Sequence, residues 1–226
     1  TYSDATSANG SGASAATGSW IIGGRNSDNL RNFPGLIDEV RVYNRALSAG
    51  EIQTLYQSGA AKFNISPTKY LTTGLVGYWT MDGNNVNWAT GAVTDSSGKG
   101  NTGTVTNMST STSPAIGKIG QALNFDGVND GVNVGSASII DDLGPMTVSA
   151  WVYPTSVVAN MTLAAKDIAL TSGNWFIRAT STASTVNALF FSKNTTANSV
   201  QRHTSNNFLT PNVWQHVVLT WNGSLV

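Results

Sequence analysis

Residues 35–59 read GLIDEVRVYNRALSAGEIQTLYQSG, and this stretch decides the fold class. Apolar and polar side chains alternate in its first part, as they do along a half-buried β-strand. The alternation predicts one face made of Leu36, Asp38, Val40 and Val42 and an opposite face made of Ile37, Glu39, Arg41 and Tyr43. Ser48 lies three residues before Glu51, the spacing of a capping box, which predicts a short helix that begins there and ends near Gly59.

The composition excludes several classes of function. The 226 residues carry a formal net charge of zero and only 11% of them are charged, so no basic stripe marks a nucleic-acid partner. The absence of cysteine from the sequence excludes disulfides and cysteine zinc sites. No apolar run reaches the roughly 18 residues of a membrane span, so no membrane insertion is expected.

The remaining composition predicts an all-β protein. The sequence is rich in Ser, Thr and Asn and has 23 glycines and seven tryptophans, a mixture typical of short strands joined by polar turns. Alternation over Met146–Pro154, with apolar side chains on both faces, predicts a central strand. Asp126-Gly127 is a turn signal that predicts a hairpin between the segments on either side of it. The first residue is Thr1, and we expect an excised or mature piece of a longer extracellular or cell-surface protein.

Four segments resemble the laminin-G-like, concanavalin A-like jelly-roll domains that occur in tandem in large surface and secreted proteins. They are IDEVR at 37–41, GLVGYWTMDG at 74–83, DSSGKGNTGT at 95–104 and ALNFDGVNDGV at 122–132. The resemblance implies a jelly-roll sandwich of two antiparallel sheets, with one short helix after the closing strand.

The order of these segments is inverted relative to that family, in which the segment like 74–83 opens the domain and the segment like 37–41 closes it. We therefore expect residues 1–60 to be the C-terminal part of a jelly roll, 61–73 a linker, and 74–226 the N-terminal part. The two parts can close into one permuted sandwich, or each can pair with the complementary part of another copy and build a filament. Loop-closure cost favours the first arrangement.

Carboxylate placement argues against an enzyme. The jelly-roll superfamily includes glucanases, which need two carboxylates flanking one glycosidic bond. The two glutamates of the sequence are Glu39 and Glu51. The capping box accounts for Glu51, and alternation predicts that Asp38 and Glu39 point to opposite faces.

A structural calcium ion is the chemistry that the sequence favours most. Residues 95–101 form a polar loop punctuated by glycine, which can turn carboxylate, amide and carbonyl oxygens toward one point. The resemblance implies that this loop shares a structural Ca²⁺ with the closing strand, and the implied ligands are Asp38, Asp95, Gly98 and Asn101. The alternative is an ordinary Asx turn, with Asp38 accepting a hydrogen bond from a neighbouring backbone amide.

Trp88 and Trp175 lie near expected loops and are candidates for stacking on a sugar ring, with packing in the core as the alternative. The sequence therefore predicts a non-enzymatic carbohydrate-binding or adhesion module of a larger repetitive surface protein. Its expected partners are carbohydrate and other copies or adjacent repeats. The competing prediction is a structural subunit of an extracellular filament, joined by exchanged half-domains or strands.

Overall fold

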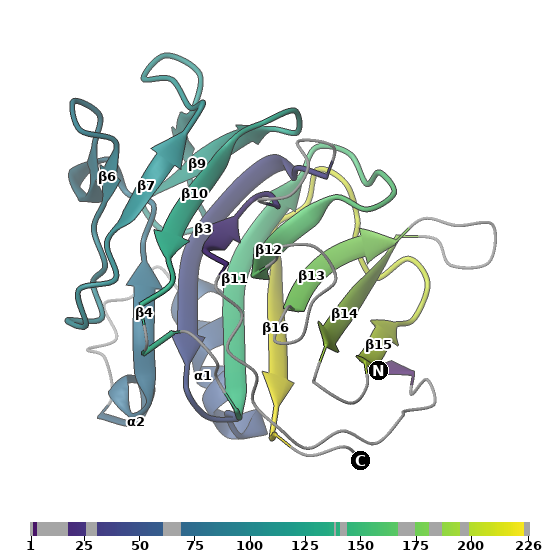
Figure 1. Ribbon diagram of the computed structural model, residues 1–226. Coiled ribbons are helices and arrows are strands. Elements are labelled where there is room, and N and C mark those ends of the chain that lie inside the picture. The colour runs from purple at the N-terminus through teal and green to yellow at the C-terminus, as the bar shows by residue number, and fades with distance from the viewer. Residues whose placement is uncertain are drawn as a thin grey trace.

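The computed structural model is a sandwich of two antiparallel β-sheets (Figure 1). It describes residues 2–3, 18–25, 31–60, 69–137, 139–140, 144–166, 175–180, 187–194 and 199–223. The two-sheet antiparallel sandwich predicted from the sequence is confirmed. Its short helix is α1 (Ala49–Ala60), and two shorter helical segments follow as α2 (Lys69–Thr72) and the 3-10 turn η1 (Gly83–Asn85).

The larger sheet, called sheet A here, has ten strands in the order β1-β15-β14-β13-β12-β2-β10-β7-β6-β5. They are β1 (Tyr2–Ser3), β2 (Trp20–Ile22), β5 (Val86–Asn87), β6 (Ala92–Val93), β7 (Gly103–Thr106), β10 (Gly131–Gly135), β12 (Thr162–Lys166), β13 (Trp175–Thr180), β14 (Ala188–Asn194) and β15 (Ser199–Thr204).

The second sheet, called sheet B, has the order β16-β11-β3-β9-β8, and β4 also pairs with β3. Its strands are β3 (Pro34–Tyr43), β4 (Leu75–Trp79), β8 (Pro114–Ile116), β9 (Gln121–Asp126), β11 (Met146–Pro154) and β16 (Gln215–Trp221). The position of β11 between β3 and β16 agrees with the central strand predicted for that segment.

The first sixty residues supply a central strand to each sheet. In sheet A, β2 lies between β10 and β12, and in sheet B, β3 lies between β11 on one side and β9 and β4 on the other. In this structure both parts of the chain therefore contribute strands to both sheets. Residues 61–68 of the expected linker lie outside the described residues, and its end forms the helical turn α2.

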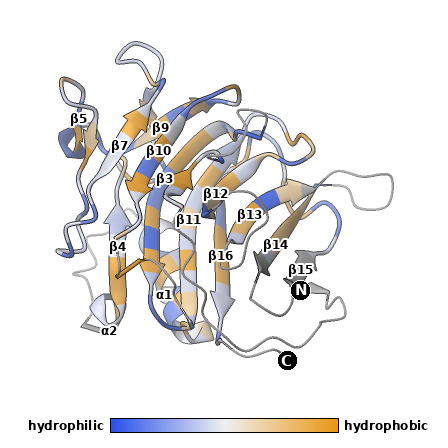
Figure 2. Ribbon diagram, viewed as in Figure 1, coloured by the Kyte–Doolittle hydropathy of each residue, from blue (hydrophilic) through white to orange (hydrophobic). Residues whose placement is uncertain are grey.

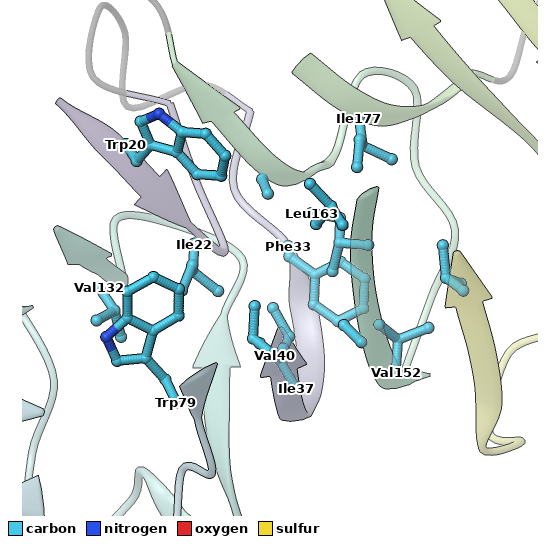
Figure 3. Packing of buried hydrophobic residues seen from close by; sticks show 14 of the residues in the cluster. Trp20, Ile22, Phe33, Ile37, Val40, Trp79, Val132, Val152, Leu163 and Ile177 are labelled. Atoms are coloured by element: carbon cyan, nitrogen blue, oxygen red, sulfur yellow. The ribbon is translucent and has the colours of Figure 1, made fainter. Parts of the chain in front are cut away.

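Side chains from both sheets meet in one apolar core (Figure 3). Residues such as Trp20, Ile22 and Leu163 point inward from sheet A, and Ile37, Val40 and Trp79 point inward from sheet B. The hydropathy colouring of Figure 2 shows the matching pattern, with hydrophobic and hydrophilic positions interleaved along β3. Removing these side chains from water is the main force that holds the two sheets together.

A β-bulge in β3 corrects the predicted alternation. Ile37 and Val40 both lie in the core, although they are three residues apart, and Glu39 between them has a φ of +55°. The extra residue leaves both Asp38 and Glu39 on the outer face of sheet B, so the prediction that they point to opposite faces is wrong. A pattern of strict alternation cannot reveal a bulge, because the bulge depends on the neighbouring strands.

The bulge also marks a fork in sheet B. Before it, residues 34–37 of β3 pair with β9, and after it, residues 40–43 pair with β4. The strand that pairs with this side of β3 therefore changes from β9 to β4 at Asp38 and Glu39. The loop that precedes β9 and the segment that follows β4 meet at this fork.

The predicted hairpin around Asp126-Gly127 is a crossing between the sheets. β9 belongs to sheet B and β10 to sheet A, and the two strands do not pair in this structure. The Asp126 carboxylate accepts hydrogen bonds from the N–H groups of Val128 and Asn129, so the turn itself forms as the sequence suggests. The turn signal is correct, and the pairing inferred from it is wrong because the core requires the chain to change layers here.

Helix α1 packs on the outer face of sheet B (Figure 1). The predicted capping box is confirmed, since the Ser48 N–H donates to Glu51 Oε2 at 2.9 Å and the Glu51 N–H donates to Ser48 Oγ at 3.4 Å. The helix ends at Ala60, the residue after Gly59, as the sequence predicts. A Cβ on Gly59 would overlap the indole of Trp151, so glycine allows the close approach of helix and strand.

Candidate functional site

The glycine loop at 95–101 is held by its own hydrogen bonds. Asp95 Oδ1 accepts the N–H groups of Tyr78 and Ser97, and Oδ2 accepts the N–H of Asn101 at 2.8 Å and the Ser97 hydroxyl. The Asn101 amide donates to the carbonyl of Val76 at 2.6 Å. The structure therefore brings Asp95 and Asn101 together in an Asx-type loop that anchors β4, and both carboxylate oxygens of Asp95 are occupied. Ca²⁺ binding by Asp95, Gly98 and Asn101 stays a prediction.

Asp38 lies at the fork of sheet B. The residue is 0% exposed, and its Oδ2 accepts the N–H of Ile119 at 2.9 Å. Its Oδ1 is buried without a hydrogen-bond partner among the described residues. The pKa of Asp38 is raised to about 8, mainly by burial and also by the nearby carboxylates of Glu39 and Asp82, although backbone hydrogen bonds from Ile119 and Lys118 oppose the rise.

A short loop ties Asp38 to Asp82. The N–H of Gln121 donates to Asp82 Oδ1 at 2.7 Å, and the Gln121 side chain accepts the N–H of Gly83 at 2.8 Å. A Cβ on Gly117 would lie 2.7 Å from Oδ2 of Asp38, so the backbone of residues 117–121 approaches both carboxyl groups closely. We call Asp38, Asp82 and residues 117–121 the carboxylate cradle.

The surroundings of Asp38 suit a carboxylate that binds a hard divalent cation better than a buried carboxyl group without a bound ion. A protonated Asp38 would have to donate a proton and an ionised one would have to bury a charge, and Oδ1 has no described partner for either state. Within the described residues no group of three or more His, Cys, Asp and Glu side chains is arranged to hold a metal ion. Backbone carbonyls and water would therefore have to complete the coordination, which Ca²⁺ accepts.

Glu39 and Arg41 form a buried ion pair beside the cradle. Arg41 donates a short hydrogen bond to Glu39 Oε2, and the Tyr78 hydroxyl donates to the same oxygen at 2.7 Å. Burial raises the pKa of Glu39, while the charge of Arg41 and the hydrogen bond from Tyr78 oppose that rise. Glu39 Oε2 is held by both Arg41 and Tyr78, so this arrangement stabilises the bulge.

His216 is a packed residue of β16. Its Nε2 lies 2.8 Å from the Ser149 hydroxyl, and its ring lies 5.0 Å from that of Trp151. Burial lowers the pKa of His216 to about 4, and the charge of Arg41 adds to the effect. Tyr56 of α1 stacks on the outer side of Trp151 with ring centroids 5.5 Å apart. This part of sheet B is thus closed by the helix.

The two candidate tryptophans occupy different environments. Trp175 is 2% exposed, and its ring packs edge-on against Trp20 with centroids 4.3 Å apart. The structure corrects the expectation for Trp175, because no face of a core side chain remains for a sugar. Trp88 is half-buried against the core in the turn between β5 and β6, and its role in ligand binding stays a prediction.

The outer face of sheet A carries a group of side chains that no sequence motif marks. Register places Arg178 of β13 opposite Phe190 of β14, and the Arg178 guanidinium lies 4.5 Å from the ring centroid of Phe176 and 5.1 Å from that of Phe190. The two rings lie 5.8 Å apart. We call Phe176, Arg178 and Phe190 the aromatic–arginine patch. The alternation of the segment WFIRAT at 175–180 could have revealed it, because buried Trp175, Ile177 and Ala179 leave Phe176 and Arg178 on the other face.

Two other arginines act on the charge of the patch. The pKa of Arg178 is lowered by burial and by the charges of Arg31 and Arg25. The Nε of Arg178 is buried without a hydrogen-bond partner among the described residues. All three side chains of the patch are half-buried, so the patch is fixed by packing and still reaches the surface.

Comparison with protein families identifies the superfamily of the chain. A family model described as the concanavalin A-like lectin/glucanases superfamily matches residues 2–53 and 126–226, which together make up more than half of the chain. No curated protein and no solved structure matches the chain. No helix among the described residues is both long enough and apolar enough to cross a membrane.

Proposed function

Because the chain belongs to the concanavalin A-like lectin/glucanase superfamily, we propose that it is a non-catalytic carbohydrate-binding module of a larger extracellular, adhesive surface protein. The observation that carries this proposal is the aromatic–arginine patch on the outer face of sheet A. Binding sites for small ligands are lined mainly by apolar and aromatic groups, with a few fixed polar groups that orient the ligand. Phe176 and Phe190 supply the aromatic surface, and Arg178 supplies the polar group.

The distribution of carboxylates supports binding rather than hydrolysis. No described strand of sheet A contains an Asp or a Glu, so these strands do not supply the acid pair that glycoside hydrolysis requires. At the fork of sheet B, Asp38 is fully buried and Glu39 is paired with Arg41. Neither carboxyl group is accessible to a polysaccharide.

A binding screen against immobilised polysaccharides tests this proposal. The wild-type protein should be retained by at least one glycan, and Phe190→Ala should weaken that retention because it removes an aromatic ring from the patch. Ile116→Ala is the matched control, since Ile116 is 86% exposed but belongs to β8 of sheet B. A protein that binds no glycan at high concentration would contradict the carbohydrate-binding function.

The proposal extends to a structural Ca²⁺ in the carboxylate cradle. Asp38 and Asp82 would hold the ion, with backbone carbonyls of residues 117–121 as further ligands. The ion would be the positively charged partner that Oδ1 of Asp38 lacks, and it would hold β4 and β9 together at the fork. This ligand set shares only Asp38 with the set implied by the resemblance, because the oxygens of Asp95 already accept four hydrogen bonds.

A second candidate function is that of a filament subunit. The observation that favours it is the central position of β2 and β3, each of which lies between strands contributed by residues 75–221. If these strands left one sandwich and entered that of a second copy, the same hydrogen bonds would join two chains. Light scattering over a range of concentrations separates the two functions, because strand exchange predicts polymers that grow with concentration and a self-contained module predicts a constant mass.

A further inference from the structure

The charges of sheet A are all of one sign. The charged residues in its ten strands are Lys166, Arg178, Lys193 and Arg202, and none of these strands contains an acidic residue. The chain as a whole has a formal net charge of zero, so the acidic residues are concentrated elsewhere, including Asp38, Glu39 and Asp126 in strands of sheet B. Among the described side chains, the basic group of these strands that reaches the outer face is Arg178, and its positive charge attracts anions.

Arg178 is the basic residue that the structure positions on the outer face. Its guanidinium lies over the rings of Phe176 and Phe190, which hold the planar group by cation–π contact. A guanidinium held in this way has lost much of its conformational freedom before any ligand arrives, so less entropy is lost on binding. The charges of Arg25 and Arg31 add to the positive potential at this point.

We propose that the aromatic–arginine patch binds an acidic glycan, a polysaccharide whose sugars carry carboxylate or sulfate groups, and that Arg178 contacts the anionic group. The inference rests on the proposed carbohydrate-binding function and names its ligand class. A fixed guanidinium matches the planar fork of a carboxylate and the oxygens of a sulfate, and such charge-assisted hydrogen bonds are about twice as strong as neutral ones. A neutral sugar would leave the guanidinium partly desolvated without an anionic partner.

The test compares pairs of glycans that differ only in charge. Polygalacturonate and its methyl ester share one backbone, and the ester lacks the carboxylate charge. Carrageenan oligosaccharides and the same oligosaccharides after chemical desulfation form a second pair, in which the sulfate is the difference. Titration calorimetry on both pairs distinguishes a carboxylate from a sulfate as the recognised group.

Substitutions at Arg178 locate the binding. Arg178→Met keeps an unbranched apolar stem against the two rings and removes the charge, whereas Arg178→Lys keeps the charge and removes the planar fork. Lys99→Ala is the matched control, because it removes one positive charge from the loop between β6 and β7. Circular dichroism and a thermal melt establish that each variant is folded. If Arg178→Met is unstable, the binding of the glycan pairs by Arg178→Lys still tests the role of Arg178.

The wild-type protein should bind the acidic member of at least one pair at least about tenfold more tightly than the neutral member, and added NaCl should weaken that binding. Arg178→Met should abolish the difference, Arg178→Lys should retain part of it, and Lys99→Ala should leave it unchanged. Equal binding of acidic and neutral members would overturn the inference and leave the carbohydrate-binding function standing. Binding to single-stranded DNA as tight as to the acidic glycan would also overturn it, since any polyanion would then suffice. If the protein binds none of the glycans, both the carbohydrate-binding function and the preference for acidic glycans are refuted.

Discussion

Replacing Asp38 with Asn distinguishes a carboxylate cradle without a metal ion from one that binds Ca²⁺. Asn has nearly the same shape as Asp, and its Oδ1 can still accept the hydrogen bond from the Ile119 N–H at 2.9 Å. Its amide places a neutral group at the position of the carboxylate oxygen that now lacks a partner. The substitution therefore removes a charge and adds little steric change, so that differences in stability report on the charge.

In the metal-free protein the charge of Asp38 destabilises the fold. Burial raises its pKa from 3.8 to about 8, which means that the folded chain binds this proton more tightly than the unfolded chain does. The contribution of Asp38 to stability is therefore complete below pH 3.8 and is lost as the pH rises toward 8. The loss is about 1.4 kcal/mol per pH unit in that window, or about 4 kcal/mol by a pH of about 7. Asp38→Asn does not undergo this loss, so in a chelator it should become more stable than wild type as the pH rises.

Calcium should reverse the order of stability. A bound cation favours the ionised carboxylate, and Ca²⁺ that binds only the folded chain adds about 2.7 kcal/mol when its concentration is about a hundred times its dissociation constant. The wild-type protein should gain that stability at neutral pH, and Asp38→Asn should gain much less because it lacks one of the two carboxylates. Asp95→Asn is the matched control. Asp95 is engaged in hydrogen bonds, so its substitution should cost the same stability with and without Ca²⁺.

Urea denaturation followed by tryptophan fluorescence measures all three proteins in EGTA and in CaCl₂, at pH values of about 5 and about 8. The expected pattern is a crossing, with Asp38→Asn more stable than wild type in EGTA at the higher pH and less stable in CaCl₂. The reasoning is refuted if Ca²⁺ raises the stability of Asp38→Asn as much as that of wild type. A loss of the Ca²⁺ response in Asp95→Asn alone would move the metal site to the glycine loop.

Two further predictions concern helix α1 and its attachment. Gly59→Ala should lower the melting temperature because its Cβ would overlap the indole of Trp151. Gly50 lies in the same helix with open space around it, so Gly50→Ala should raise the stability by about 0.5–1 kcal/mol. Equal melting temperatures for the two variants would contradict the packing of Gly59 against Trp151. Hydrogen bonds from Arg45 lower the pKa of Glu51 to about 2, so the contribution of Glu51 to stability is present above its ordinary pKa of 4.5 and is lost as the pH falls toward 2. Glu51→Gln should remove that part of the acid dependence in a stability titration, and a wild-type-like acid profile in this variant would argue against the capping interaction.

Local patterns predicted the elements that depend on local physics. The capping box at Ser48 and Glu51 was predictable because both partners lie within one helical turn. The two-sheet sandwich was predictable because alternation, turn residues and the family-like segments all point to it. The partners of Asp38 were not predictable from the loop at 95–101, since they depend on which strand lies beside each half of β3.

The bulge at Glu39 shows why sequence reasoning failed at the candidate site. A non-glycine residue with a φ of +55° is unfavourable by itself and persists because Arg41 and Tyr78 hold its carboxylate. Nothing local in the sequence marks this conformation, and alternation assigns Asp38 and Glu39 to opposite faces. The patch around Arg178 was missed for a different reason, because Phe and Arg in a short strand form no recognised motif.

The two outer faces of the sandwich are suited to different roles. Part of the outer face of sheet B is covered, since α1 and α2 bury an apolar cluster that includes Tyr43, Leu47 and Leu55. The cradle and the Glu39–Arg41 pair lie beside this cluster and stabilise the fork. A ligand that binds the covered part would have to displace the helix. The outer face of sheet A has half-buried aromatic rings, a fixed guanidinium and no acidic strand residue, so binding energy can be gained there without unfolding any element.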